Sequence, residues 1–289
     1  MVAYTSAQPI RRWRRAPSRR VGHIRLIDVD DRFALDLPAL SRQIAADEAA
    51  GLTSAFGAPR SARPVPQRST LSVGSPSSPG PTVCGATSMR PAQGGDALRE
   101  LRHHVDGVDL VDSYTWNAHK WLATNFDCSI LWVADRRPLV DAMRIVPPYL
   151  QNAASDAGEV IDYRDWQVPL GRRFRALKLW FVLRAFGADG LRARIRADIA
   201  RARRLADWID DQPQLMTIAP TEFGLVSFIH VDGDAATDAL IDHVNADPGL
   251  YVLGSAIGGR RFIRVSIGST WTEDRHVDAL RDRIAAGLG

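Results

Sequence analysis

Apolar residues in the last third of the chain follow two different periods. Between residues 191 and 210 they recur at helical spacing, which is typical of a helix with one buried face. That face consists of Leu191, Ile195, Ile199, Leu205 and Ile209. Residues 261–267 instead alternate polar and apolar side chains, and this period of two predicts a β-strand.

The remaining patterns of this region predict a small α+β domain. Apolar segments at 224–231 and 250–253 predict two further strands, and residues 234–245 predict a helix. Thr272 is expected to cap a final helix, whose inward face consists of Val277, Leu280 and Ile284. We therefore assign residues 186–289 to a C-terminal small α+β domain.

The centre of the chain has two predicted helices and a predicted strand. Residues 173–186 form a helical pattern, and Gly187 and Gly190 separate it from the helix at 191–210. The continuous apolar run at 128–133 predicts a buried strand, followed by a short helix that opens at Asp135. Cys128 is expected to be a small buried core residue.

Arginines are frequent in both predicted helices. Arg172, Arg173 and Arg175 could face an anion or form structural ion pairs, and ion pairs are the favoured interpretation. The arginines between residues 191 and 210 are expected to form a solvated face.

The front of the chain has shorter elements and two stretches without periodicity. Strands are expected at 1–7 and 23–28, a helix at 39–50 that stops at Gly51, and a short helix at 100–104. Residues 8–20 have no apolar stripe at helical spacing. Residues 57–97 are rich in proline, serine, glycine and arginine, which predicts a linker or disordered segment.

Composition excludes several classes of protein. The formal net charge is +4 and the chain has two cysteines, which rules out a disulfide framework and fits the reducing cytoplasm. No apolar run is long enough to span a membrane, and no secretory signal or metal-ligand spacing is present. The basic residues at 11–20 could bind nucleic acid, but no recognised binding module follows them, so we expect no nucleic-acid partner.

One stretch, Asp112-Ser-Tyr-Thr-Trp-Asn-Ala-His-Lys-Trp121, has the features of a lysine attachment site for pyridoxal phosphate. A lysine amine can condense with the cofactor aldehyde to a Schiff base when its surroundings lower its pKa and hold it still. Lys120 lies between an imidazole, His119, and an indole, Trp121, and follows a small-residue turn. A His-Lys pair by itself is usually a solvated surface pair, and the sequence on both sides decides against that interpretation.

That context resembles the group II pyridoxal-phosphate-dependent decarboxylases, the family of the aromatic-L-amino-acid decarboxylases. The resemblance rests on four blocks that occur in the family's order: Asn-Ala-His-Lys-Trp (117–121), Asn-Phe-Asp-Cys-Ser (125–129), residues 162–175, and Leu-Lys-Leu-Trp-Phe-Val-Leu-Arg (177–184). It covers residues 99–289 well and residues 21–56 moderately.

The resemblance implies a fold, a reaction and a set of site residues. The fold is a partial aspartate aminotransferase-like large domain (fold type I, α/β) over residues 1–185, followed by the small domain. The reaction is decarboxylation of an L-amino acid to the amine and carbon dioxide. The resemblance implies that this amino acid is aromatic. Lys120 carries the cofactor, His119 lies beside it, Asn117 matches a phosphate-contacting position, and Tyr149 matches the loop tyrosine that returns a proton to the substrate carbon. The family forms homodimers.

The sequence departs from the family in three respects. Residues 8–20 lack the histidine that stacks on the cofactor ring, and residues 57–97 lack the His-Val-Asp-Ala-Ala motif whose aspartate pairs with the pyridine nitrogen. The sequence that resembles the family stops near Ala55 and resumes near Glu100 with a spacing close to that expected. Our hypothesis is therefore that 8–20 and 57–97 are translated out of frame. The chain also starts late relative to the family, so an N-terminal truncation is expected.

Three functional interpretations stay open at this point. The chain could be a working decarboxylase, completed where necessary by a separately encoded N-terminal part. It could be an inactive remnant that still binds the cofactor or a partner. It could also be an aminotransferase-like enzyme of the same fold.

Overall fold

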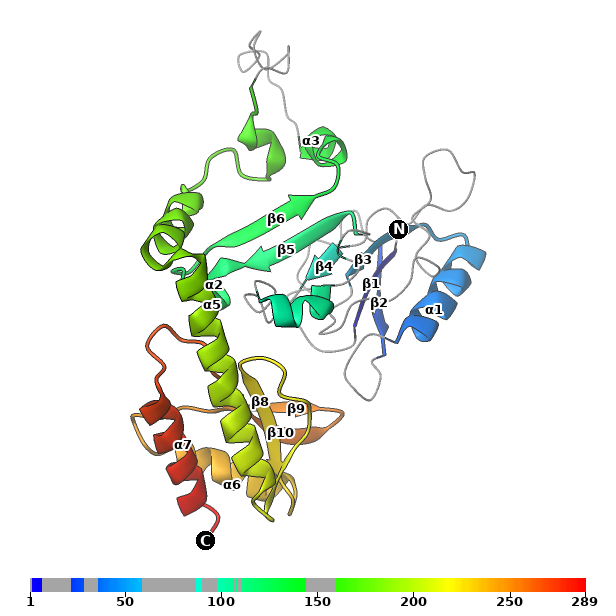
Figure 1. The fold of residues 1–289 in the computed structure, drawn as a ribbon. Coiled ribbons are helices and arrows are strands. Elements are labelled where there is room, and N and C mark those ends of the chain that lie inside the picture. The colour runs from blue at the N-terminus through cyan, green and yellow to red at the C-terminus, as the bar shows by residue number, and fades with distance from the viewer. Residues whose placement is uncertain are drawn as a thin grey trace.

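The computed structural model describes residues 2–6, 22–28, 36–58, 87–89, 98–105, 108, 111–143 and 160–289. These residues contain three separate β-sheets and three clusters of buried apolar side chains. Figure 1 shows the long helix α5 (Arg175–Asp210) running from the central sheet to the C-terminal sheet.

The N-terminal sheet contains three parallel strands in the order β2-β1-β3, and helix α1 packs with it. The strands are β1 (Val2–Ser6), β2 (His23–Ile27) and β3 (Ser54–Ala58), and α1 spans Leu37–Ala49. The Asp36 side chain accepts a hydrogen bond from the Ala39 backbone N–H at 2.9 Å and so caps α1. Gly51, with φ of 73°, ends the turn after this helix. The predicted strands and helix of this region are confirmed.

The central sheet has the order β4-β5-β6, and its first strand corrects one prediction. Strand β4 (Thr87–Met89) pairs in parallel with β5 (Ser113–Asn117), which pairs antiparallel with β6 (Ser129–Val133). Strand β4 and the end of β3 both lie in the stretch 57–97, where we expected a linker or disorder. The error arises because β4 is stabilised by backbone hydrogen bonds to β5, which composition does not report. The rest of 57–97 and all of 8–20 lie outside the described residues.

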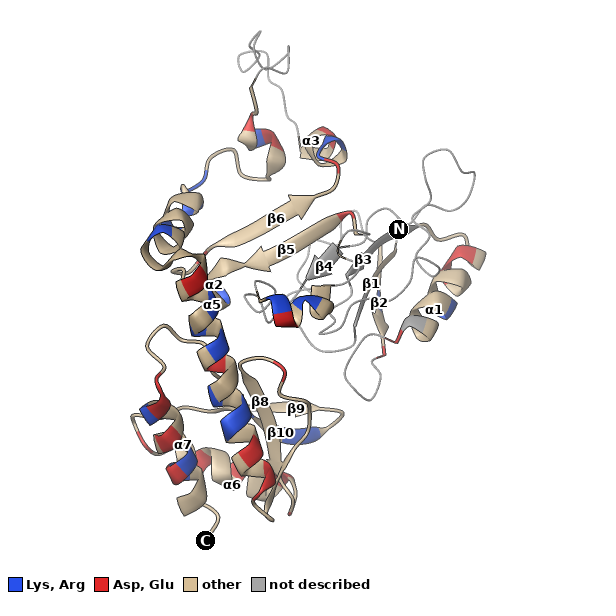
Figure 2. Cartoon of the chain, in the orientation of Figure 1, with Lys and Arg blue, Asp and Glu red and all other residues tan. Residues whose placement is uncertain are grey.

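Strand β6 has the predicted position but not the predicted burial. Leu131 and Trp132 are both 49% exposed. Among the described strands β6 pairs with β5 alone, so it lies at the edge of its sheet. Figure 2 shows that neither β5 nor β6 carries a charged side chain. Short helical segments accompany this sheet: η3 (Arg99–Val105), α2 (Ala118–Trp121), α3 (Arg137–Met143) and η6 (Tyr163–Trp166).

Helix α5 consists of two helical parts separated by a kink at Gly187. This residue has φ of 63° and ψ of 172°, a conformation that glycine adopts at low cost. The prediction of two helices is therefore confirmed, although Gly190 is helical and does not contribute to the break. The predicted apolar face is buried along its whole length: Leu191, Ile195, Ile199, Leu205 and Ile209.

The C-terminal sheet has the order β7-β8-β10-β9, with all neighbours antiparallel. It contains β7 (Leu215–Thr217), β8 (Leu225–His230), β9 (Leu253–Ile257) and β10 (Arg260–Ser266). Helices α6 (Asp234–Asn245) and α7 (Asp274–Ala286) complete the region. The predictions missed β7, which has three residues, and placed β9 too early, at 250–253.

The start of α7 also differs from the prediction. The N-cap is Glu273 and not Thr272. The Glu273 backbone N–H donates a hydrogen bond to Nδ1 of His276 at 3.0 Å, so a side chain in the first turn completes the cap. The predicted inward face of α7 is confirmed, because Val277, Leu280 and Ile284 are all buried.

The arginines on the second half of α5 do more than form a solvated face, which corrects that prediction. Arg201 and Arg204 lie 3.2 Å and 3.3 Å from Asp274 of α7, and Arg204 lies 3.2 Å from Asp278. These ion pairs therefore connect α5 with α7, a contact that the apolar periodicity of the two helices did not predict.

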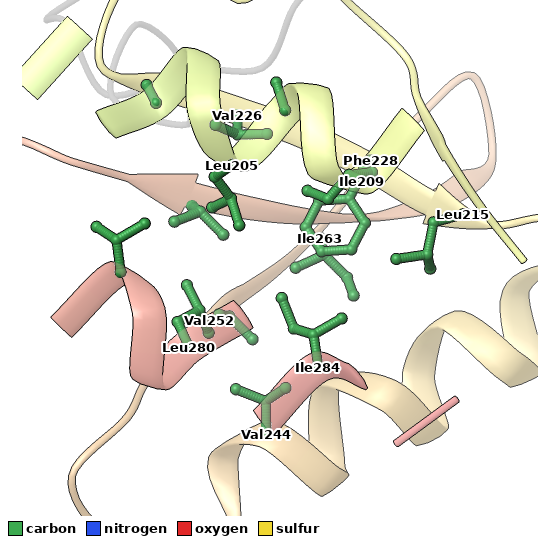
Figure 3. Packing of buried hydrophobic residues seen from close by; sticks show 14 of the residues in the cluster. Leu205, Ile209, Leu215, Val226, Phe228, Val244, Val252, Ile263, Leu280 and Ile284 are labelled. Atoms are coloured by element: carbon green, nitrogen blue, oxygen red, sulfur yellow. The ribbon is translucent and has the colours of Figure 1, made fainter. Parts of the chain in front are cut away.

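The largest buried cluster lies between α5, α6, α7 and the C-terminal sheet (Figure 3). Phe228 of β8 and Ile263 of β10 are opposite each other in the antiparallel register, and both are fully buried. Residues opposite each other on one face of a sheet stabilise it by direct side-chain contact. None of the helices described here is long and apolar enough to cross a membrane.

Replacing Phe228 with alanine is expected to destabilise the protein by about 3–5 kcal/mol, because it removes a fully buried ring and leaves a cavity. Urea unfolding followed by circular dichroism measures this loss. The matched control is Tyr251→Ala, where the ring is 77% exposed and the expected change is below about 0.5 kcal/mol. Equal losses in the two variants would contradict the assignment of this core.

Candidate functional site

Lys120 is the third residue of the four-residue helix α2, which begins where β5 ends. The side chain of Lys120 is exposed, whereas Ala118 and Trp121, on either side of the His-Lys pair, are buried. Lys120 is therefore accessible on a turn that is held by the burial of Ala118 and Trp121. Ligands of open α/β sheets commonly bind at the carboxyl ends of strands, which is where this turn lies.

His119 is fixed by the backbone of Cys128, nine residues later. Its Nδ1 lies 3.0 Å from the Cys128 backbone nitrogen and 2.9 Å from the Cys128 carbonyl oxygen. In one tautomer Nδ1 accepts from the N–H, and in the other it donates to the carbonyl. Either tautomer keeps a hydrogen bond to the same residue. The ring of Phe126 also packs edge-on against the imidazole, with the centroids 4.8 Å apart.

Asn117 is held across the sheet. The Ser129 hydroxyl donates to Asn117 Oδ1 at 2.5 Å, and the two residues are opposite each other in the β5–β6 register. The amide orientation is therefore set by a neighbouring strand, next to the lysine turn.

Trp121 anchors the turn to α5 and to the C-terminal region. Its Nε1–H donates to the Asp198 carboxylate at 2.9 Å, and both residues are buried. A Cβ at Gly268 would lie 2.7 Å from Trp121 Cδ1, and one at Gly224 would lie 3.0 Å from Trp121 Cζ2. The indole therefore occupies space that side chains at these two positions would fill.

Asp127, in the loop after the lysine turn, forms ion pairs with arginines near the start of α5. The sequence predicts structural ion pairs for three arginines there, and two of them form such pairs. Arg173 and Arg175 lie 2.9 Å and 3.0 Å from the carboxylate of Asp127, and Arg172 is exposed. Hydrogen bonding to Arg175 lowers the pKa of Asp127 from 3.8 to about 2.

Cys128 is a buried core residue, as predicted. Its side chain is 2% exposed, and burial raises the pKa of the thiol. The residue therefore acts here through its backbone, which holds His119, and not as a nucleophile.

The residues at this turn fit a pyridoxal phosphate attachment site. The donor set consists of an exposed primary amine, an imidazole and an amide on one rigid turn, which matches the chemistry of aldehyde condensation and anion binding. The whole chain contains two lysines, Lys120 and Lys178. Tyr149 lies outside the described residues, so its position relative to Lys120 stays a prediction.

The remaining features of the described chain do not form a second chemical centre. No group of three or more metal-binding side chains occurs among the residues that the structure describes. A cavity of about 440 Å³ between α5 and α7 is lined by Arg204, Trp208 and Val277, among others, and includes none of the predicted site residues.

Sequence reasoning missed Asp198, Gly224 and Gly268. One signal for Asp198 was available, because it lies three residues after Ile195 and one before Ile199, on the apolar face of the helix. A carboxylate at such a position needs a buried partner. The two glycines gave no signal, since their role depends on a ring that is far away in sequence.

Comparison with known proteins gives consistent results. Residues 91–231 match the family model described as the pyridoxal-dependent decarboxylase conserved domain. The chain is 41% identical to tryptophan decarboxylase 2 of Oryza sativa subsp. japonica over 201 residues, which are 66% of this chain and 40% of that protein. It is 42% identical to phenylacetaldehyde synthase of Arabidopsis thaliana over 185 residues, which are 62% of this chain and 38% of that protein.

The fold matches solved structures over almost its whole length. The crystal structure of Oryza sativa TDC with PLP and tryptamine has a TM-score of 0.83 and 30% identity, and the match covers 99% of this chain and 62% of that one. The structure of Catharanthus roseus tryptophan decarboxylase in complex with L-tryptophan has a TM-score of 0.81, 28% identity and the same two coverages. The chain thus spans about two fifths of the length of the curated relatives.

The ion pair of Asp127 predicts a pH-dependent contribution to stability. Because the folded-state pKa is lowered to about 2, the contribution is present above the unfolded-state value of 3.8 and is lost as the pH falls toward 2. Asp127→Asn should therefore lower the melting temperature at pH 7, and the difference from wild type should shrink between about pH 4 and about pH 2.

The measurement is a series of thermal melts across that pH range. The control is Asp242→Asn, which makes the same charge change at an exposed position of α6. A difference between wild type and Asp127→Asn that stays constant from pH 7 to pH 2 would contradict the role of the charged pair.

Proposed function

We propose that the chain belongs to the group II pyridoxal-dependent decarboxylases, whose conserved-domain model matches residues 91–231, and that it is part of an enzyme that decarboxylates aromatic L-amino acids. Its fold is that of the fold type I pyridoxal-phosphate enzymes. The chain spans 40% of the length of tryptophan decarboxylase 2. We therefore propose the reaction for the chain together with the other polypeptide parts that a complete site requires.

The observation that carries the proposal is the position of Lys120. Lys120 is an exposed residue on a turn whose neighbouring side chains, His119 and Trp121, are fixed by Cys128 and Asp198. A lysine that condenses with an aldehyde must be reachable and held in one place. Lys120 meets both conditions.

Bound pyridoxal phosphate supplies an electron sink for the electron pair that carbon dioxide leaves behind. Lys120 holds the cofactor covalently at the end of β5. His119 flanks it from a ring orientation that Cys128 fixes, and Asn117 contributes an amide for the phosphate. Tyr149 is proposed to return a proton to the substrate carbon, a step that a phenol can catalyse when it is shielded from water.

Aromatic substrates are supported by the names of the relatives, which include tryptophan decarboxylase 2 and a tyrosine decarboxylase of Narcissus pseudonarcissus. A second candidate product is an aldehyde, since the relative from Arabidopsis thaliana is a phenylacetaldehyde synthase with similar identity. Its release with carbon dioxide and ammonia is a two-electron oxidation of the amino acid and requires dissolved dioxygen as the oxidant. We also propose a cytoplasmic homodimer, which the exposed apolar side chains of β6 support.

A division into two domains is part of the same proposal. The boundary is placed near the kink at Gly187, with 1–185 forming the partial cofactor-binding domain and 186–289 the small domain. The C-terminal apolar cluster, which begins at Ala202, supports a separate core for the second part.

Incubating the purified chain with pyridoxal phosphate, followed by borohydride reduction and peptide mass spectrometry, is expected to label Lys120 at one cofactor per chain. The matched controls are Lys120→Ala, which should lose the label, and Lys178→Ala, which should keep it. Labelling of Lys178 alone, or no labelling, would contradict the assignment of the site.

Replacing Tyr149 with phenylalanine is expected to lower amine formation from L-tryptophan or L-tyrosine at least about tenfold, because the substitution removes the proposed proton donor. Chromatography of the products distinguishes the amine from the aldehyde. Tyr251→Phe is the control, since that ring is 77% exposed on the C-terminal part of the chain.

The wild-type products decide between the remaining interpretations. Amine with carbon dioxide supports the decarboxylase, aldehyde supports the second candidate, and transfer of the amino group to a keto acid supports an aminotransferase. No product, also when the remaining length of such an enzyme is supplied as a separate polypeptide, would make this chain an inactive remnant.

A further inference from the structure

We propose that Asp198 is a positioning residue that orients Lys120 through Trp121, an inference that rests on the proposed function of Lys120. The two residues that make the contact are 77 positions apart in sequence, and the Trp121 Nε1–H donates to Asp198 Oδ2 at 2.9 Å. Trp121 directly follows Lys120, so the position of the indole and the direction of the lysine backbone are coupled.

The carboxylate of Asp198 is itself fixed by burial and by a hydrogen bond. Asp198 is fully buried, and its second oxygen accepts a hydrogen bond from Arg201 Nη1 at 3.1 Å. Arg201 in turn lies 3.2 Å from Asp274 of α7. A buried carboxylate is costly unless it is paired, and here an arginine pairs one oxygen while the other is available to the indole.

The indole also packs closely against the backbone at two glycines. A Cβ at Gly268 would lie 2.7 Å and 2.9 Å from two atoms of the five-membered ring. At Gly224 a Cβ would collide with the Ile267 carbonyl oxygen and would lie 3.0 Å from the six-membered ring. The two glycines therefore leave the space that the indole needs, and the hydrogen bond to Asp198 fixes its position there.

The short helix α2 depends on such anchors. A helix of four residues cannot stabilise itself, because it is too short to offset the cost of nucleation. Two of its side chains are anchored, His119 on Cys128 and Trp121 on Asp198, and they lie on either side of Lys120. Loss of one anchor should leave the amine exposed but poorly directed, and a misplacement of about 1 Å can lower a rate about 100-fold.

The experiment compares four variants of the full chain. Asp198→Leu removes the acceptor, and Trp121→Phe removes the donor but keeps most of the ring. Asp198→Asn keeps an oxygen that can accept from the indole, so it is the conservative rescue. Asp278→Asn is the matched control, because it weakens the ion pair of Arg204 with α7 and leaves Asp198 and Trp121 untouched.

The first readout is the rate at which pyridoxal phosphate is trapped on Lys120 by borohydride, corrected for the folded fraction of each variant. We expect Asp198→Leu and Trp121→Phe to be at least about tenfold slower than wild type. Asp198→Asn should stay within about threefold and Asp278→Asn within about twofold, although Asp278→Asn should lower the melting temperature.

The second readout is the indole N–H resonance of Trp121 in a nitrogen-15 NMR spectrum, assigned among the eight tryptophans by its loss in Trp121→Phe. It should move upfield in Asp198→Leu and stay near its original position in Asp198→Asn, because only the former lacks an acceptor. This measurement reports the hydrogen bond without any cofactor.

The outcomes separate the two proposals. If wild type is not labelled on Lys120, the proposed function fails and the positioning role fails with it. If wild type is labelled and the Asp198→Leu and Trp121→Phe variants are labelled at the same rate, the positioning role alone fails. It also fails if the indole resonance is unchanged in Asp198→Leu, or if Asp278→Asn slows labelling as much as Asp198→Leu.

Discussion

The apolar face of the second half of α5 is shared by two hydrophobic clusters, and the arrangement of the lysine turn depends on it. Leu191, Ile195 and Ile199 pack in the cluster that contains Trp121, whereas Ala202, Leu205 and Ile209 pack in the cluster of the C-terminal sheet. One helix thus fixes the distance between the turn and that sheet. Asp198 lies on the same face, directly before Ile199 of the first group, so its polar contact with Trp121 is made beside the cluster that contains the indole.

Elements with a strong local period could be predicted from sequence, and elements that depend on distant partners could not. The stripe of α5 and the inward face of α7 follow from side-chain spacing alone, and the kink at Gly187 follows from the flexibility of glycine. Strand β7 has three residues, too few for a period to be recognised, and its place is set by pairing with β8. The ion pairs of Arg201 and Arg204 likewise require α7 to be in position, which the pattern of α5 does not contain.

The candidate site likewise has a part that could be predicted from sequence and a part that depends on distant residues. Asn117, His119 and Lys120 could be named from sequence because they are contiguous, and a single turn brings them together whatever the rest of the chain does. The groups that hold them come from three other places: Ser129 in β6, the backbone of Cys128 just before it, and Asp198 in α5. A motif therefore identifies which groups could do the chemistry, while their orientation is a property of the tertiary structure.

The exposure of β6 shows what an apolar pattern predicts and what it leaves open. A strand with apolar residues on both faces is typical of a sheet that is covered on both sides, and this pattern led to the expectation of burial. Leu131 and Trp132 project from an edge strand that has no charged residue, and charge is one of the common means of protecting such an edge. The apolar sequence of β6 is thus suited to a strand whose faces are covered by other residues. In the proposed homodimer, the partner subunit would cover it. Since β6 pairs with β5 and holds Asn117 through Ser129, a partner on β6 would also stiffen the strand that ends at the lysine turn.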